Sequence, residues 1–242
     1  IKKQKFENYE VIVVDGKSSD GTIELIKEIK DEKFKYIIEK DTGIYDAMNK
    51  GIKLSKGDWI IFLNSGDEFY NQDILKEVSI KETKNYNVIY ADTVINNGSF
   101  QYKAKATNFT NRTFLMPFCH QSTFVRRALI DKFKFDLKYE ISSDFNFFMQ
   151  CSKQNEKFFN LNMIISKTLS GGFSDKNRNK VFDENLRIIR ENNCSFILIF
   201  KLWKKKIINF IMNILKFIMP NFLILFFLKI KYYKFIIPKS DL

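Results

Sequence analysis

Residues 11–22 of the chain read VIVVDGKSSDGT. Four β-branched residues in a row with polar neighbours are typical of a buried strand. The polar segment that follows contains Ser19 and Asp20, and either of them is a suitable helix N-cap. Apolar residues then recur at helical spacing over residues 23–29. The segment therefore predicts a strand, a tight loop and a helix.

Short apolar runs of the same kind recur along the chain between segments with helical spacing. We predict further strands at 35–38, 59–63, 87–91, 122–126 and 158–168, and helices at 44–52, 72–84, 142–154 and 178–193. Asn96-Asn97-Gly98 indicates a hairpin. Strands that alternate with helices favour crossover connections, so we expect an α/β fold with a mostly parallel sheet flanked by helices.

The end of the chain differs from the rest in charge. The 242 residues carry 40 Lys and Arg against 28 Asp and Glu, a net charge of +12, and residues 195–242 alone contribute +8. Residues 207–228 contain fifteen Ile, Leu or Phe and one charged residue, Lys216. A segment that is both basic and apolar favours an anionic membrane surface over nucleic acid. We therefore predict a body at residues 1–193 and a membrane-associating helical tail at residues 194–242.

Several arrangements of this tail are open. Lysines flank the apolar stretch on both sides, so a membrane span would carry one basic cluster across the bilayer, against the positive-inside tendency. Pro220 also interrupts a helix. We favour two short amphipathic helices on the cytoplasmic leaflet, which would place the protein in the cytoplasm, peripheral on the inner face of the membrane. A single span, or a helical hairpin packed on the body or in a homodimer, is the alternative.

Acidic residues follow the first four predicted strands at intervals of 26, 26 and 25 residues: Asp15, Asp41, Asp67 and Asp92. Ligands of open α/β sheets bind outside the carboxyl ends of the strands, so we expect these carboxylates at one crevice. Carboxylates in a crevice repel one another unless a cation lies among them. Mg²⁺ or Mn²⁺, completed by substrate phosphates, suits such oxygen ligands. Each Asp taken singly could instead be a turn former or a helix cap.

Five segments resemble motifs of the family 2 glycosyltransferases, in the same order. DGKSSDGT at 15–22 resembles the Asp-rich D-G-x-S-x-D-G-T motif, and DTGIYDAMNKGI at 41–52 resembles the next segment of the polysaccharide-synthesis branch. KGDWIIFLNSGD at 56–67 is similar to the strand that leads into the acidic metal-binding motif. His120-Gln121 and SDFNFF at 143–148 resemble acceptor-side motifs. The resemblance covers roughly residues 7–175.

The resemblance implies a GT-A fold and an inverting glycosyltransferase. Its donor would be a nucleotide sugar, and its acceptor a hydroxyl of a glycan or a lipid-linked molecule in cell-surface polysaccharide synthesis. By the resemblance, Asp15 and Asp41 would bind the nucleoside, and Asp67 would bind the Mg²⁺ or Mn²⁺ that bridges the donor diphosphate. Asn64 and Gly66 stand where the family often has acidic residues, so Asp67 is the one carboxylate left for the metal.

Asp144 is the candidate general base. It follows two serines that start a predicted helix, and the positive end of that helix favours the ionised carboxylate. An ionised Asp144 could take the proton of the acceptor hydroxyl, although a simple acidic cap is the alternative. His120, Gln121 and Asp92 are candidates for contact with the acceptor or the diphosphate, while His120 could instead be a structural hydrogen-bonding residue.

The family's domain normally begins with one more strand–helix unit, whose strand lies centrally and touches the nucleotide. We place residue 1 inside the end of that first helix, and therefore expect exposed strand edges and an incomplete nucleotide site. A function of another class is also open: a non-catalytic protein with a degenerate transferase fold that binds membrane surfaces. Nucleic-acid binding is disfavoured because the aromatic residues of the tail are mixed with Ile and Leu.

Overall fold

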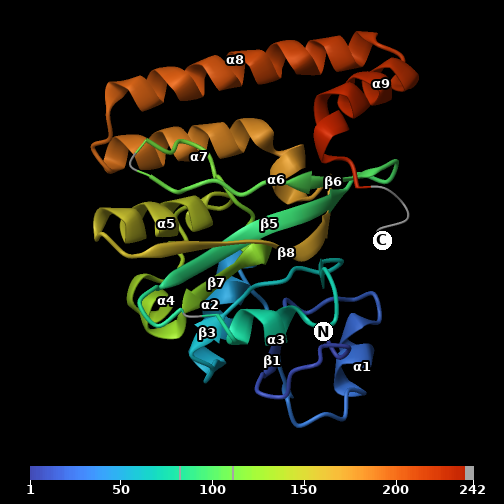
Figure 1. The fold of residues 1–242 in the computed structure, drawn as a ribbon, viewed down its shortest axis with the longest axis vertical. Coiled ribbons are helices and arrows are strands. Elements are labelled where there is room, and N and C mark those ends of the chain that lie inside the picture. The colour runs from blue at the N-terminus through green and yellow to red at the C-terminus, as the bar shows by residue number, and fades with distance from the viewer. Residues whose placement is uncertain (82, 111, 238–242) are drawn as a thin grey trace.

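The computed structural model of the chain describes residues 1–81, 83–110 and 112–237. Its strands are β1 (Val11–Asp15), β2 (Phe34–Ile38), β3 (Trp59–Ile60), β4 (Glu68–Phe69), β5 (Val88–Asn96), β6 (Gln101–Ala104), β7 (Thr123–Arg126) and β8 (Phe158–Leu169). Its helices are α1 (Thr22–Lys27), α2 (Ile44–Leu54), α3 (Ile74–Ser79), α4 (Arg127–Phe133), α5 (Ser143–Lys153), α6 (Phe173–Lys176), α7 (Arg178–Glu191), α8 (Phe196–Ile218) and α9 (Asn221–Tyr232), with 3₁₀ turns η1 (His120–Ser122) and η2 (Tyr233–Phe235). Figure 1 shows α7 and α8 on one side of β5 and β8, with β1 and α1 on the other.

The predicted alternation of strands and helices is confirmed. Three details differ: β3 pairs over only two residues, α3 has six residues instead of thirteen, and β5 continues to Asn96 instead of ending before Asp92. The predicted cap of α1 is displaced by one residue, since Gly21 at φ 88° precedes the helix. The Asp20 carboxylate still accepts a hydrogen bond from the Thr22 N–H.

The sheet is mixed, which corrects the prediction of mostly parallel pairing. β1 and β2 form a parallel pair, and a second sheet has the order β3-β7-β5-β8-β4 with β6 added beside β5. In the second sheet only β5 and β8 pair in parallel, within the described part of the chain. The connection of residues 97–100 between β5 and β6 is too short for a parallel crossover, so this pair must be antiparallel.

A groove separates the two sheets. Within the described residues β1 pairs only with β2, and β3 pairs only with β7. The groove has a volume of about 850 Å³ and is lined by β1 residues such as Val11 and Val14 and by residues 60–63. One edge of β1 and one edge of β3 thus have no strand partner among the described residues.

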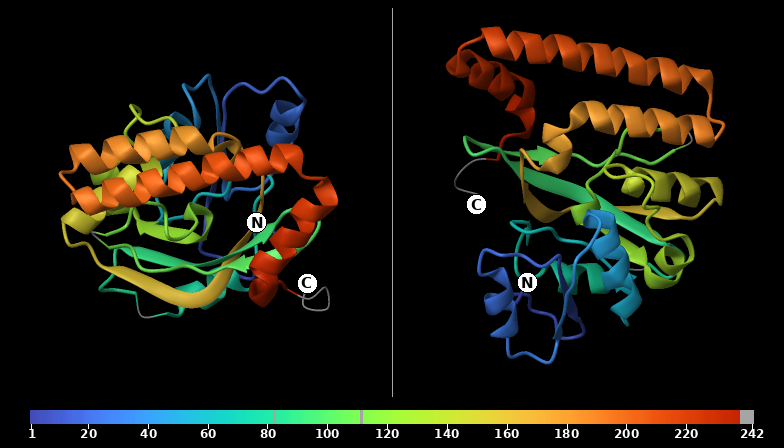
Figure 2. Two further views of the ribbon diagram at one scale, coloured as in Figure 1. Left: turned by 90° about the horizontal axis from the view of Figure 1, so that it is seen from above. Right: turned by 180° about the vertical axis from the view of Figure 1, so that it is seen from behind.

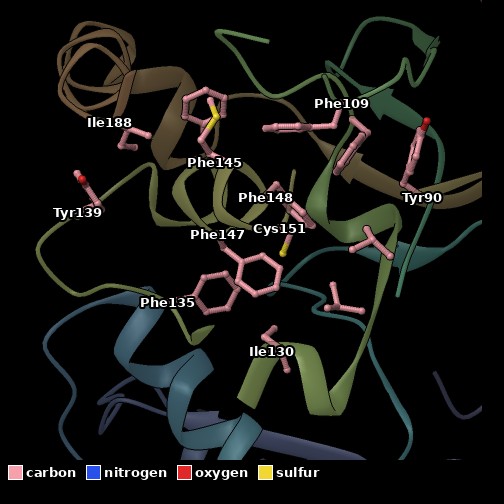
Figure 3. Packing of buried hydrophobic residues seen from close by; sticks show 14 of the residues in the cluster. Tyr90, Phe109, Ile130, Phe135, Tyr139, Phe145, Phe147, Phe148, Cys151 and Ile188 are labelled. Carbon is pink, nitrogen blue, oxygen red and sulfur yellow. The ribbon is translucent and has the colours of Figure 1, made fainter. Parts of the chain in front are cut away.

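A core of aromatic side chains fixes α5 (Figure 3). Phe145, Phe147 and Phe148 are each at most 3% exposed, and they pack against Phe109 and Phe135, among others. Most residues of α5 are buried. A helix held on several sides in this way presents its first residues, including position 144, at a fixed place in the fold.

The tail begins as part of the body and then leaves it. Four residues separate its first helix, α8, from the end of α7, near the predicted boundary between residues 193 and 194. Leu198 and Leu202 are 2% exposed and belong to the main core, and α8 lies along α7 before its last part and α9 extend beyond that helix (Figure 2). With 23 residues, α8 is not the short helix that we expected. The division into two domains stays a prediction. Among the described residues, no helix combines the length and the apolar character that a membrane crossing requires.

Candidate active site

Asp15 and Asp41 meet at the carboxyl ends of β1 and β2. Asp15 accepts hydrogen bonds from the Ser18 N–H at 2.8 Å and from the Ser18 hydroxyl at 2.7 Å, and these bonds lower the pKa of Asp15. A Cβ atom on Gly16 would lie 2.5 Å from Asp41 Oδ2, so the Asp41 carboxylate lies directly beside the residue that follows Asp15. The parallel pairing of β1 with β2 therefore brings together the two residues predicted to bind the nucleoside.

Asp67 lies in the turn before β4, beside η1. Its Oδ2 atom accepts a hydrogen bond from the Asn64 N–H at 3.0 Å. Burial raises the pKa of Asp67, while hydrogen bonds from Asn64 and Gln121 and the nearby His120 act in the opposite direction. The structure thus places three of the predicted site residues, Asp67, His120 and Gln121, next to one another.

Asp144 stands in the first turn of α5, as predicted. The Tyr45 hydroxyl lies 2.9 Å from Asp144 Oδ1 and 3.0 Å from the Ile141 carbonyl oxygen. His120 Nδ1 lies 3.5 Å from Asp144 Oδ2. Burial, and next the charge of Asp144, raise the pKa of Tyr45 well above its ordinary value, so the hydroxyl stays protonated and able to donate.

The carboxylates of Asp67, Asp144 and Asp175 lie near Cys119, the residue before η1. Burial raises the pKa of the Cys119 thiol, and the charges of Asp67, Asp144 and Asp175 all act in the same direction on it. The Asp175 carboxylate comes from α6 and also accepts a hydrogen bond from the Gly171 N–H. The second sheet, α5 and α6 therefore bring acidic groups together around η1.

The donor atoms available for a metal are few. Within the described chain, no three His, Cys, Asp or Glu side chains are arranged so that they could hold a metal ion together. Mg²⁺ usually keeps several water ligands and takes one or two carboxylates together with substrate phosphates. As a single carboxylate in a half-buried site, Asp67 suits a cation whose other ligands are phosphate oxygens and water.

Asp92 also lies beside η1, because its backbone carbonyl accepts a hydrogen bond from the Ser122 hydroxyl at 3.1 Å. It lies inside β5 with 6% exposed, and its Oδ1 atom accepts a hydrogen bond from the Ala106 N–H at 2.8 Å. Lys103 Nζ lies 3.6 Å from the other carboxylate oxygen. These contacts hold the chain after β6 against β5. The predicted acceptor contact of Asp92 stays a prediction.

Sequence reasoning missed the residues that hold Asp144 in place. Tyr45 belongs to the segment quoted for the resemblance, but its spacing from Asp144 gives no signal of contact. Glu184 of α7 accepts hydrogen bonds from three consecutive backbone N–H groups, of residues 140–142, each at 2.9 Å. A glutamate on a helix face carries no mark of this contact in the sequence.

Comparisons with known proteins agree with this architecture. The profile of glycosyl transferase family 2 matches residues 1–152. A PGL/p-HBAD biosynthesis glycosyltransferase of Mycobacterium bovis is 31% identical over 157 residues, which cover 62% of this chain and 61% of that protein. An uncharacterized glycosyltransferase of Rickettsia bellii is 38% identical over 91 residues, 37% of this chain and 13% of that protein. The chain thus spans about three fifths of the length of the mycobacterial relative.

Solved structures share the fold at low sequence identity. TarS of S. aureus, residues 1–349 in complex with UDP, superposes with a TM-score of 0.59 at 19% identity, over 80% of this chain and 60% of that chain. A mannosyltransferase from Pyrobaculum calidifontis in complex with GDP-Man and Mn²⁺ gives a TM-score of 0.57 at 13% identity, over 78% and 57%.

The fold is therefore that of a GT-A-like glycosyltransferase, as the sequence predicted. The chain belongs to glycosyl transferase family 2.

Proposed function

We propose that this chain transfers a sugar from a nucleotide-sugar donor to a hydroxyl of a glycan or lipid-linked acceptor, with inversion, in the synthesis of a cell-surface polysaccharide. The observation that carries this proposal is the Asp144 carboxylate at the start of α5, with Tyr45 and His120 beside it. The fold neighbours in complex with UDP and with GDP-Man support a nucleotide-sugar donor.

The chemistry follows from where the carboxylates lie. Asp144 takes the proton of the acceptor hydroxyl as its oxygen attacks the anomeric carbon, while the α5 N-terminus stabilises the ionised carboxylate. Asp15 and Asp41 accept hydrogen bonds from the nucleoside. Asp67 would hold Mg²⁺ or Mn²⁺, which when bound would stabilise the negative charge of the leaving diphosphate. His120 and Gln121 contact the acceptor or the diphosphate. We place the protein peripherally on the anionic inner face of the membrane.

The test of catalysis compares Asp144→Asn with Asp131→Asn, which removes a carboxylate of α4 that pairs with Arg127. Loss of the general base should lower the transfer rate by roughly 10²–10⁴, while nucleotide binding persists. The control variant should keep its rate. A screen of nucleotide sugars with a lipid-diphosphate acceptor measures both. Full transfer activity in Asp144→Asn would refute the assignment.

Nucleotide and metal binding separates this function from the alternative of a non-catalytic, membrane-binding protein. A ligand that binds only the native state raises the melting temperature, so UDP with Mn²⁺ near a hundred times the dissociation constant should raise it by about 5 °C or more. Asp67→Asn should abolish the part of the shift that depends on Mn²⁺. If no nucleoside diphosphate changed the melting temperature, the non-catalytic, membrane-binding alternative would be favoured.

A further inference from the structure

The end of α8, α9 and η2 form a surface that is both apolar and basic, here called the tail surface. Sixteen large apolar side chains between residues 207 and 235 are 38–93% exposed: Ile207, Ile208, Phe210, Ile211, Met212, Ile214, Leu215, Phe217, Ile218, Phe222, Leu225, Phe226, Phe227, Ile230, Tyr233 and Phe235. Their exposed area is on the order of 1,000 Å². A soluble monomer rarely exposes a contiguous apolar patch of more than a few hundred Å², so the tail surface has the character of a docking surface.

The charge of this surface identifies what it binds. Residues 192–240 contain nine Lys and neither Asp nor Glu. Exposed lysines stand at both ends of the apolar region: Lys201, Lys204 and Lys205 on α8, and Lys229, Lys231 and Lys234 on α9 and η2. Within the described residues none of these six forms a salt bridge, whereas Lys206 pairs with Asp183. The partner must therefore accept apolar side chains and carry negative charge.

A second copy of the chain meets only the first of these requirements. A two-fold symmetric dimer packs the same patch against itself, so it would bring the lysines of both copies together in a desolvated interface. An anionic bilayer meets both requirements. Its acyl boundary accepts the apolar side chains, and its headgroups pair with lysines whose stems lie along the apolar surface.

We propose that the tail surface docks on an anionic lipid bilayer, with α8 and α9 lying in its interface. Two attachments hold this surface to the body. The first half of α8 packs on the core through Leu198 and Leu202. At the other end, Tyr232 of α9 stacks on Tyr102 of β6 with ring centroids 4.0 Å apart, and the Ile237 N–H donates to the Gln101 carbonyl at 3.0 Å.

The second attachment lies close to the candidate active site. β6 pairs with β5, and the β5 residue Thr93 donates through its hydroxyl to Ser122 Oγ at 2.7 Å. Ser122 ends η1, which begins at His120. A docked tail surface therefore fixes the orientation of η1 to the bilayer, which suits an acceptor that is itself anchored in lipid. This inference rests on the membrane location in the proposed function. It can be tested separately, because vesicle binding requires no sugar transfer.

The test is flotation of the full chain with vesicles of phosphatidylcholine alone and of equal parts phosphatidylcholine and phosphatidylglycerol. We expect binding to the anionic vesicles and little to the neutral ones. The variant Lys229→Glu/Lys231→Glu/Lys234→Glu should lower the partition coefficient by about 100-fold or more, since each Lys near an anionic surface contributes about fivefold. The matched control, Lys27→Glu/Lys30→Glu/Lys53→Glu, changes the net charge equally on α1, on the loop after it and on α2, and it should bind as the parent does.

A second pair of variants tests the apolar contact. Phe217→Ser/Phe226→Ser should bind anionic vesicles at least tenfold less well, while Leu25→Ser/Ile80→Ser, at apolar residues exposed elsewhere, should not differ from the parent. Equal losses in the two lysine variants, or full binding by Phe217→Ser/Phe226→Ser, would overturn the proposal. The proposal would also be overturned if the chain did not bind vesicles and instead sedimented as a dimer, and if Phe217→Ser/Phe226→Ser dissociated that dimer. Vesicle binding by a chain without transferase activity would leave this inference intact.

Discussion

The Tyr45 side chain is 6% exposed, and its hydroxyl has two acceptors within reach, the Asp144 carboxylate and the Ile141 carbonyl. Burying a hydroxyl group costs free energy of folding unless the hydroxyl forms a hydrogen bond. Its contact fixes the orientation of the Asp144 carboxylate against the start of α5. Tyr45 is therefore a positioning residue for the proposed base.

Replacing this hydroxyl gives a prediction at the scale of one residue. Tyr45→Phe should lower kcat about tenfold, because a hydrogen bond to a charged group contributes about 1.5–3 kcal/mol. The KM for the nucleotide sugar should not change, since the Tyr45 hydroxyl contacts Asp144 and the Ile141 carbonyl and neither Asp15 nor Asp41. Steady-state kinetics separates the two constants. Tyr36→Phe, at a tyrosine of β2 that is 49% exposed, is the control. A change in KM alone would contradict the positioning role.

Among the elements, α7 holds the loop that leads into α5. Glu184 accepts the three backbone hydrogen bonds described above, and Glu191 accepts one from the Tyr139 hydroxyl at 2.5 Å. Lys138 Nζ lies 3.0 Å from the Glu191 carboxylate. One face of α7 thus satisfies backbone donors of the loop that would otherwise lack partners at the start of α5. The position of Asp144 depends on this helix, although α7 lies beyond the matched family region.

Glu184→Ala tests this contact between elements. Loss of three charge-assisted hydrogen bonds should lower the free energy of unfolding by about 2–4 kcal/mol, measured by urea denaturation. The transfer rate should fall as well, because the loop no longer holds Asp144. Asp183→Ala removes the neighbouring carboxylate of α7, which forms an exposed ion pair with Lys206, and should cost less than about 1 kcal/mol. Equal effects of the two changes would contradict the assignment.

The contribution of Glu191, on the same helix, to the free energy of unfolding should depend on pH. The Tyr139 hydroxyl, Lys138 and Arg187 hold the pKa of Glu191 at about 2, below the ordinary value of 4.5. A depressed pKa means that the contribution of Glu191 to stability is complete above pH 4.5 and is lost as the pH falls through about 2.

Glu191→Gln should therefore lower the melting temperature at pH 7, by about 2–4 °C, because the carboxylate is partly exposed. The difference from the parent should shrink below pH 4.5 and vanish near pH 2. Differential scanning calorimetry across this range is the measurement. A difference that stays constant down to pH 2 would show that the charge of Glu191 is not responsible.

At the scale of the whole molecule, the tail is attached at its two ends and open between them. The α8 start is part of the core, and the α9 end rests on β6 (Figure 2). The apolar residues between these points have few protein neighbours, so this segment should open more readily than the central sheet.

The Tyr102–Tyr232 contact can be removed to test this organisation. Tyr232→Ser should increase amide hydrogen exchange by about tenfold or more at Ile237 and along α9, since a stacked aromatic pair contributes about 0.5–1.5 kcal/mol beyond its buried area. Exchange in β5 and β8 should stay slow. Tyr233→Ser, at a neighbouring tyrosine that is 77% exposed, is the control. Unchanged exchange of α9 in Tyr232→Ser would show that this contact does not anchor the helix.

The sequence by itself indicated most of the strands and helices, because local periodicity and turn chemistry mark them, although β4, α4 and α6 were not predicted. It also offered Asp15, Asp67 and Asp144 as candidate residues, through their place after strands or at a helix start and through the resemblance to family motifs. The charge and apolar character of the tail were equally visible, since both follow from composition.

Only the tertiary structure decided which elements meet. It gave the sheet its mixed pairing, placed Asp92 inside a strand and brought Tyr45 and Glu184 to the start of α5. These contacts join residues dozens of positions apart, and the path of the folded chain sets them. No local pattern records that path, because each of these residues would have the same neighbours in sequence if the elements packed differently.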